Sequence, residues 1–267
     1  METVLIPPAN AYFLGIPTIV FSFLIPIAGV VIFSYIITMR GIPLLKAAPD
    51  KRWNRLGERF RKLLKIWLFQ YRHPRYMLAG VLHIILFAGF LVLSIRSISL
   101  VFIGISENFV FPGLGGPLGA VYNLFKDYAA TMVLVSCVIA MIRRGIFKPE
   151  RYAVPERYGK DHTMEAVFVL CLISTLMISE TLFEASAAVA QSQKGLHAEF
   201  IAPLSLAWFF KILLGGADMG TLQGMHLIMY YIHDVTFFFF LCFLPLGKHF
   251  HVITSIFNVF FMRIDRG

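Results

Sequence analysis

Long apolar runs separated by short polar segments dominate the chain. Five of these runs are continuous rather than alternating, and each exceeds the roughly 20 residues that a helix needs to cross a bilayer. They cover residues 12–39, 74–103, 118–141, 163–190 and 221–246. In lipid, only helices and closed barrels satisfy every backbone polar group. The pattern therefore predicts an all-α membrane protein, a five-transmembrane-helix bundle that forms a single domain over residues 1–267.

Three shorter segments are amphipathic or too short to cross. Residues 53–69 mix basic and apolar side chains, which predicts a helix on the cytoplasmic headgroups or, alternatively, a docking surface for a cytoplasmic partner. Residues 252–262 predict a second helix on the cytoplasmic face. Residues 201–214 are apolar but short, which indicates an interfacial or re-entrant helix in an outer loop.

Basic residues are distributed unevenly between the loops. They gather in residues 40–75 and 143–160, whereas residues 107–116 and 191–220 carry few of them. The positive-inside rule then places the N-terminus outside and the C-terminus in the cytoplasm, with the chain in the inner (cytoplasmic) membrane. Topology accounts for the formal net charge of +9 without a nucleic-acid partner, and 58% hydrophobic residues exclude an ordinary soluble domain.

The three cysteines, Cys137, Cys171 and Cys242, all lie inside apolar runs and form no Cys-x-x-Cys motif. A disulfide framework or a zinc site is not expected from this pattern. An iron–sulfur cluster needs about four cysteine ligands. Any such cluster would therefore belong to another domain or subunit.

The histidines are the most informative polar residues. His83, His226 and His233 lie inside apolar runs, and His73 and His251 stand where such runs meet basic loops. Ionisable side chains at membrane depth are costly and usually functional. Imidazole is also a common axial ligand of haem iron. Several histidines in one bundle thus indicate a redox function rather than solute transport.

The histidine spacings predict two levels in the membrane. His73 and His83 are ten residues apart, which would separate them by about 15 Å along a helix. His226, His233 and His251 follow at spacings of seven and eighteen, which puts all three on one face of a continuous helix. Pairs of His73 with His251 and of His83 with His233 could then clamp two stacked haems.

That pairing leaves one mismatch. Along an unbroken helix His233 and His251 would be about 27 Å apart, which exceeds the separation expected for His73 and His83. Helix tilt and a bend at Pro245 would reduce the difference. The position of His226 alone fits either a hydrogen-bonding residue between helices or a functional group.

The last apolar run carries a family resemblance. The stretch His226-Leu-Ile-Met-Tyr-Tyr-Ile-His233, followed by Pro-x-x-Lys-His-x-His at residues 245–251, resembles the nitrate reductase gamma-subunit family. That family includes the membrane subunit of heterodisulfide reductase and the membrane domains of bacterial iron–sulfur oxidoreductases. The stretch Lys248-His249-Phe-His251 and the segment Asn258-Val-Phe-Phe look closer to the heterodisulfide reductase and iron–sulfur oxidoreductase branch.

The resemblance implies a cytochrome b domain with two haem b groups that exchanges electrons with menaquinone or ubiquinone. Carried over by position, the haem ligands would be His73, His83, His233 and His251. The implied partner is a cytoplasmic iron–sulfur or flavoprotein subunit, beside membrane lipid.

Basic residues at the cytoplasmic level could serve the inner haem. Arg72, Arg75 and Lys248 lie near the proposed inner ligands in the sequence. Cations of this kind pair with carboxylates such as haem propionates.

A second group of polar residues is expected near the outer ends of the helices. Its members are Arg96, Lys126, Asp127, Glu180, Glu184 and His226. A functional interpretation is a quinone pocket in which Arg96, Glu180, Glu184 and His226 exchange protons with the quinone. The alternative is a set of snorkelling charges and interhelical ion pairs.

The sequence therefore favours a di-haem b membrane subunit of a respiratory-type, quinone-linked oxidoreductase complex. An alternative is a non-redox transporter or an ion or proton pathway lined by histidines. A structural anchor would explain the basic loop but not the buried histidines.

Overall fold

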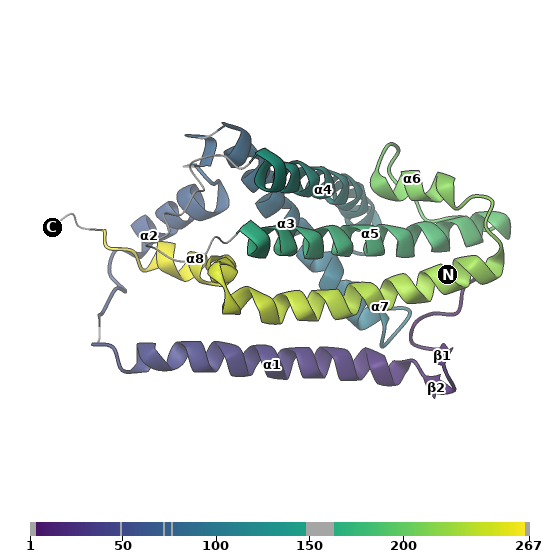
Figure 1. Cartoon of the computed structure of the whole chain (residues 1–267), viewed down its shortest axis with the longest axis horizontal. Coiled ribbons are helices and arrows are strands. Elements are labelled where there is room, and N and C mark those ends of the chain that lie inside the picture. The colour runs from purple at the N-terminus through teal and green to yellow at the C-terminus, as the bar shows by residue number, and fades with distance from the viewer. Residues whose placement is uncertain (1–3, 49, 72, 76, 148–162, 265–267) are drawn as a thin grey trace. The chain divides into compact units, whose positions relative to one another are not determined.

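The structure, a computed structural model, describes residues 4–48, 50–71, 73–75, 77–147 and 163–264. Five helices are long and apolar enough to cross a membrane, which confirms the helical, multi-pass character predicted from the apolar runs (Figure 1). They are α1 (Ile19–Leu45), α3 (Met77–Ile103), α4 (Gly116–Ile142), α5 (Thr163–Gln193) and α7 (Met219–Phe243). Helix α4 continues as a π-helical segment, Arg143–Phe147. Part of the second basic loop, residues 148–162, lies outside the described residues.

The first span begins later than the apolar pattern predicts. Residues expected at its start instead form a small antiparallel ladder, β1 (Tyr12–Phe13) with β2 (Ile16–Pro17). The turn between them has positive φ at Leu14 (49°) and Gly15 (80°), as a two-residue hairpin turn requires. The expected start at residue 12 is therefore wrong, because a short apolar hairpin and a helix end carry the same hydrophobic pattern.

The chain divides into two compact units, which are described separately. The first contains residues Met1–Ile27 and Ile85–Phe237, and the second contains Ala28–Ile84 and Phe238–Gly267. Helices α1, α3 and α7 each contribute residues to both units.

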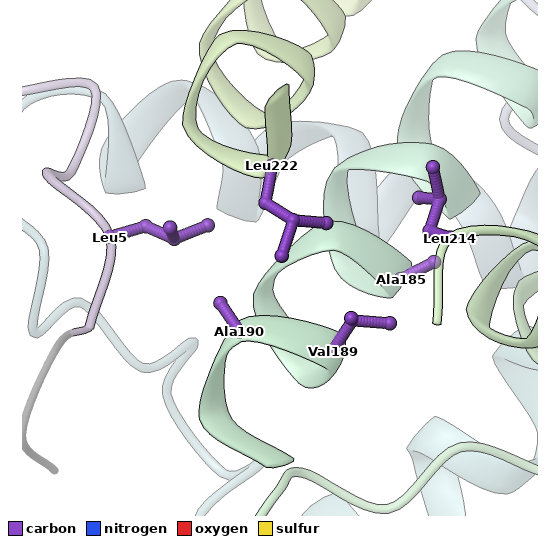
Figure 2. Close-up of a cluster of buried hydrophobic side chains, with 6 residues drawn as sticks. All are labelled: Leu5, Ala185, Val189, Ala190, Leu214 and Leu222. Carbon is purple, nitrogen blue, oxygen red and sulfur yellow. The ribbon is translucent and has the colours of Figure 1, made fainter. Parts of the chain in front are cut away.

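Helix α5 is the centre of the first unit. Half of its apolar stretch is buried, compared with 11% for α1. Small side chains let neighbours approach it closely, as is common between membrane helices. Figure 2 shows the resulting hydrophobic cluster, formed by Leu5, Ala185, Val189, Ala190, Leu214 and Leu222.

A short helix, α6 (Leu206–Leu213), also packs against α5. The Ser205 hydroxyl caps it by accepting a hydrogen bond from Trp208 N at 3.1 Å. Eight residues are too few to cross a bilayer, so a short helix is confirmed within residues 201–214, and its interfacial or re-entrant position stays a prediction.

The second unit joins the first basic loop to the end of the chain. Helix α2 (Leu56–Leu63), which continues as a π-helical segment at Leu64–Leu68, packs against α8 (His251–Phe260). Arg59 is 3% exposed and donates to the carbonyl oxygens of Phe260 (2.9 Å) and Met262 (3.0 Å). A buried guanidinium thus satisfies the carbonyl groups at the end of α8, which have no partner within the helix.

The last span is not continuous with α8. Helix α7 ends at Phe243, and the 3₁₀ turns Leu244–Leu246 and Lys248–Phe250 separate it from His251. Pro245 lies in the first turn, where its ring and missing N–H stop an α-helix. The expectation of His226, His233 and His251 on one unbroken helical face is therefore wrong for His251.

Candidate functional site

Two histidines of α7 dock on α5 in the same way. Nδ1 of His226 lies 3.1 Å from the carbonyl oxygen of Phe183, and Nδ1 of His233 lies 3.2 Å from that of Leu176. The histidines are seven residues apart, and so are the carbonyl groups, in opposite order along the antiparallel helices. Both side chains are buried, with exposures of 7% and 2%. The sequence spacing of seven thus becomes a repeated contact between the two helices.

This docking bears on the free ring nitrogen. When Nδ1–H donates to a backbone carbonyl, Nε2 is left with a lone pair, as in histidines that bind metal. Nε2 of His233 lies 3.1 Å from the Ser97 hydroxyl of α3, itself buried. His226 instead stacks on the Phe183 ring, with ring centroids 4.0 Å apart. His233 therefore bridges α5 and α3 in this structure, and its role as a haem ligand stays a prediction.

The second unit contains the other three proposed ligands. The rings of His73 and His83 stack with centroids 4.3 Å apart and an interplanar angle of 16°. Nδ1 of each is buried and has no hydrogen-bond partner among the described residues. A buried polar atom of this kind is costly and needs an explanation such as a bound group.

The predicted 15 Å separation of His73 and His83 is wrong. Helix α3 begins only at Met77, and His73 lies in a separate 3₁₀ turn, His73–Arg75. That turn folds back onto α3, where a Cβ at Gly80 would come within 1.9 Å of the His73 carbonyl oxygen. Only glycine allows this approach, so the ten-residue spacing does not become a difference in depth.

His251 begins α8, and its Nδ1 lies 3.0 Å from the carbonyl oxygen of Lys248. It therefore shares the carbonyl-bound Nδ1 of His233, although its side chain is exposed. As individual donors, the four imidazoles suit haem iron. The pairing of His83 with His233, which belong to different units, stays a prediction.

The proposed contacts to haem propionates also stay predictions. Arg75 is exposed at the end of the 3₁₀ turn that holds His73, and Lys248 begins the turn before His251. Arg72 lies outside the described residues.

The first unit brings together most of the polar residues expected near the outer helix ends. We call them the ion cluster: Arg96 on α3, Lys126 and Asp127 on α4, and Glu180 and Glu184 on α5. Arg96 reaches Glu180 (3.1 Å) and Glu184 (2.9 Å). Lys126 contacts Asp127 (3.1 Å), Glu180 (3.5 Å) and Glu184. The cluster ties three helices together across the first unit.

The cluster is deeply buried and unevenly charged. Side-chain exposure is 2–3% for Lys126, Asp127 and Glu180, 11% for Glu184 and 18% for Arg96. Three carboxyl groups face two cations, so full ionisation would leave one negative charge without a partner. In addition, Oε2 of Glu180 has no hydrogen-bond partner among the described residues. Because an unpaired buried charge is costly, the cluster is suited to hold an exchangeable proton.

His226 does not join the ion cluster as expected. Its hydrogen-bonding contacts go to the Phe183 carbonyl and, at 3.4 Å, to the Ser186 hydroxyl. It lies on α7 against the same helix that carries Glu180 and Glu184, but its Nδ1 is committed to the backbone.

A small cavity borders the ion cluster. Its volume is about 10 Å³, the lower limit for one water molecule. Its walls come from α4, from α5 and from the segment before α6: Asn123, Lys126, Glu184, Ala188, Glu199, Phe200 and Ile201. Glu199 is not among the site residues predicted from the sequence. The one sequence feature that could have pointed to it is a carboxylate in a predicted outer loop with few charges.

Two known proteins resemble the chain over most of its length. A probable iron-sulfur-binding oxidoreductase, FadF, of Bacillus subtilis (strain 168) is 25% identical over 244 residues. An EtfAB:quinone oxidoreductase of Syntrophomonas wolfei subsp. wolfei (strain DSM 2245B / Goettingen) is 23% identical over 227 residues. The matches cover 89% and 83% of this chain but 32% and 30% of the two relatives. The chain therefore spans about a third of the length of these relatives.

No protein-family model matches the chain. No solved structure matches it either.

Proposed function

We propose that the chain is the di-haem b membrane part of a quinone-linked oxidoreductase. Both relatives are named as oxidoreductases, one iron–sulfur-binding and the other quinone-linked. Five apolar helices provide the membrane setting. Buried histidines with carbonyl-bound or unpartnered Nδ1 atoms provide the ligand chemistry.

The observation that carries the proposal is the geometry of His233. Its ring is 2% exposed, its Nδ1 is held by the Leu176 carbonyl, and its Nε2 faces the polar side chain of Ser97. Holding Nδ1–H fixes the tautomer and raises the basicity of Nε2.

In this proposal His73 with His251 and His83 with His233 would hold the two haems, which requires the stacked rings of His73 and His83 to move apart when haem binds. Haem b would supply one-electron transfer when bound, and these histidines would be the residues that hold it. The chain's own residues fix ring orientation and exclude water around the deeper ligand. Arg75 and Lys248 are the proposed cations for the propionates of the inner haem.

The ion cluster is the proposed proton-exchanging end of the site. Reduction of a quinone to a quinol takes up two protons with two electrons, and quinol oxidation releases them. Glu180 and Glu184 can accept or supply those protons, while Arg96 and Lys126 hold the carboxylates in place. His226, with one free ring nitrogen near the same helix, is a further proton carrier in this proposal.

In the orientation predicted by the positive-inside rule, the ion cluster would lie towards the outer side and the basic loop in the cytoplasm. The unit formed by α2 and α8 would then face a cytoplasmic iron–sulfur or flavoprotein partner, or a further domain of the same polypeptide. The length of the relatives, about three times that of this chain, supports such a partner.

A reduced-minus-oxidised visible spectrum of the purified chain tests the proposal. We expect a b-type haem band and two haems per chain by pyridine extraction. A chain that is purified folded from a haem-replete membrane and shows no such band would refute it. The alternative hypothesis, a transport pathway lined by histidines, would then be favoured.

A further inference from the structure

The cavity beside the ion cluster connects buried and exposed carboxyl groups. On its inner side lie Lys126 (3% exposed side chain) and Glu184 (11%). On its outer side lies Glu199, an exposed residue of the loop between α5 and α6. Asn123 adds an amide to the wall. A water molecule needs two to four polar partners, and these side chains offer them.

The outer wall of the cavity is held in place by α4. Asp127 Oδ2 accepts a hydrogen bond from Ala202 N (2.8 Å), and Thr131 Oγ1 accepts one from Leu206 N (2.9 Å). The Tyr128 hydroxyl donates to the carbonyl oxygen of Pro203 at 3.1 Å. Three hydrogen bonds from α4 thus fix the segment that follows Glu199. The position of Glu199 at the cavity mouth is therefore a property of the fold.

The surroundings of the Glu199 carboxyl group favour its neutral form more than water does. Loss of hydration raises the pKa of the Glu199 carboxyl group above its ordinary value of 4.5, and the nearby carboxyl group of Glu184 raises it further. Arg96 and Lys126 lower that pKa and Asp127 raises it, so the raising effects dominate. On its own segment, the other titratable side chains are those of Lys194 and His197, and both are exposed. A carboxyl group with a raised pKa binds a proton more readily than an ordinary one, which suits it to proton transfer.

We infer that this cavity is a proton passage, with Glu199 at its water-facing end and Glu184 at its inner end. A proton from bulk water binds the Glu199 carboxylate and makes it a neutral acid. Through one bridging water, the proton then moves to the Glu184 carboxylate, and Glu199 returns to its charged form. Only O–H bonds break and form, no electron is transferred, and quinol oxidation runs the same steps in reverse.

The inference deepens the proposed function, because it names the route that serves the proton-exchanging end of the site. Glu199 acts through Glu184 and is not assigned contact with the quinone. In this role Asp127 is a positioning residue, since its carboxylate holds the outer wall through Ala202.

The experiment compares Glu199→Gln with Glu107→Gln, which neutralises an exposed carboxylate in the loop between α3 and α4. Both variants are reconstituted with their redox partner in vesicles, and electron transfer to quinone is followed across pH. We expect Glu107→Gln to match the unmodified chain. Glu199→Gln should slow turnover at alkaline pH by roughly tenfold. This effect is smaller than the loss of a catalytic acid would cause, because water outside the cavity partly replaces Glu199 as the proton donor.

Infrared spectroscopy provides a readout that does not depend on turnover. A carboxylic acid band that disappears on raising the pH, with a midpoint above 4.5, should be present in the chain and in Glu107→Gln and should lose amplitude in Glu199→Gln, where only the ion cluster contributes to it. Glu199→Asp should restore both the band and part of the rate. Asn123→Leu, which removes a polar wall group without changing charge, should slow turnover while leaving the band.

The outcomes separate the two proposals. If Glu199→Gln keeps the normal rate and pH profile with haem bound, the proton passage is wrong and the proposed function stands. If the unmodified chain binds no haem or does not reduce or oxidise quinone, the proposed function itself fails. Should Glu199→Gln not fold, Asn123→Leu at normal speed overturns the passage by itself.

Discussion

Nε2 of His233 lies 3.1 Å from the hydroxyl of Ser97, so α3 and α7 meet at the nitrogen that a haem ligand would use. The opposite nitrogen is held by α5 through the Leu176 carbonyl. One imidazole therefore contacts two neighbouring helices, and its environment is polar on both sides of the ring. Ligand geometry of this kind comes from packing between helices and has no counterpart in the sequence of α7 alone.

Replacing His233 should remove one haem and spare the other. His233→Leu deletes the imidazole while filling the space, so we expect haem content to fall from two per chain to one, measured by pyridine extraction. His197→Leu, in an exposed loop, is the control and should keep both haems. Loss of both haems, or of neither, would contradict the proposed pairing.

Replacing Ser97 tests whether its hydroxyl competes with haem iron for Nε2 of His233 or helps to orient that nitrogen. Ser97→Ala removes the contact to Nε2 without adding volume, and we expect both haems to bind. Ser97→Leu adds bulk where the ligand nitrogen points and should exclude the deeper haem selectively. Equal haem content in the two variants would argue against Nε2 of His233 as the ligand atom.

Removing Arg96 should be costly. Arg96→Leu leaves Glu180 and Glu184 with Lys126 as their main cationic partner in the cluster. Breaking one side of a buried ion network costs about 3–5 kcal/mol, which should lower the thermal midpoint in detergent. Lys46→Leu, which removes an exposed cation, should leave the midpoint nearly unchanged.

The same substitution separates quinone chemistry from packing. Where Arg96→Leu or the milder Glu180→Gln still folds, haem content should be normal while quinone turnover slows. Turnover at the normal rate with Glu180→Gln would assign the cluster to interhelical ion pairing alone.

A buried cation, Arg59, contributes to the junction of α2 and α8. Arg59→Ala removes hydrogen bonds to the Phe260 and Met262 carbonyl groups, and charged hydrogen bonds contribute about 1.5–3 kcal/mol each. We expect faster hydrogen exchange in α8 and easier proteolysis after it. Arg61→Ala, on an exposed face of the same helix, should behave like the unmodified chain. Equal exchange in both variants would show that the hydrogen bonds of Arg59 do not hold α8 in place.

The start of α7 should show a defined pH dependence. Asp218 precedes the helix and accepts hydrogen bonds from Thr221 N (3.0 Å) and Thr221 Oγ1 (2.7 Å), which lower the pKa of its carboxyl group below 3.8. A lowered pKa means that the stabilisation is complete above 3.8 and is lost as the pH falls through the native value. Protection of the amides in the first turn of α7, corrected for the intrinsic pH dependence of exchange, should therefore fall only in strong acid. Asp218→Ala should show the reduced protection at every pH.

Helix number, order and approximate length were predictable from the apolar runs, because lipid forces a continuous run of that length to satisfy its own backbone. The charges of the ion cluster were also expected near one level, since 1.5 Å of rise per residue converts sequence position into depth within a helix. That argument holds for Arg96, Glu180 and Glu184, which lie inside regular helices. It needs no knowledge of which helices are neighbours.

The same argument failed where the backbone leaves the helix. His73 lies in a turn folded over Gly80, and Pro245 separates His251 from α7, so neither spacing gives a depth. Which groups pair with which was decided only by tertiary packing, as in the contacts of Lys126 with Glu184 or of His233 with Ser97. The position of Glu199 at the cavity depends likewise on hydrogen bonds from α4 to the segment beyond it. The apolar pattern indicates which segments lie in lipid. Contacts between polar side chains depend on how each helix is rotated and which helices are its neighbours, and no single apolar run contains that information.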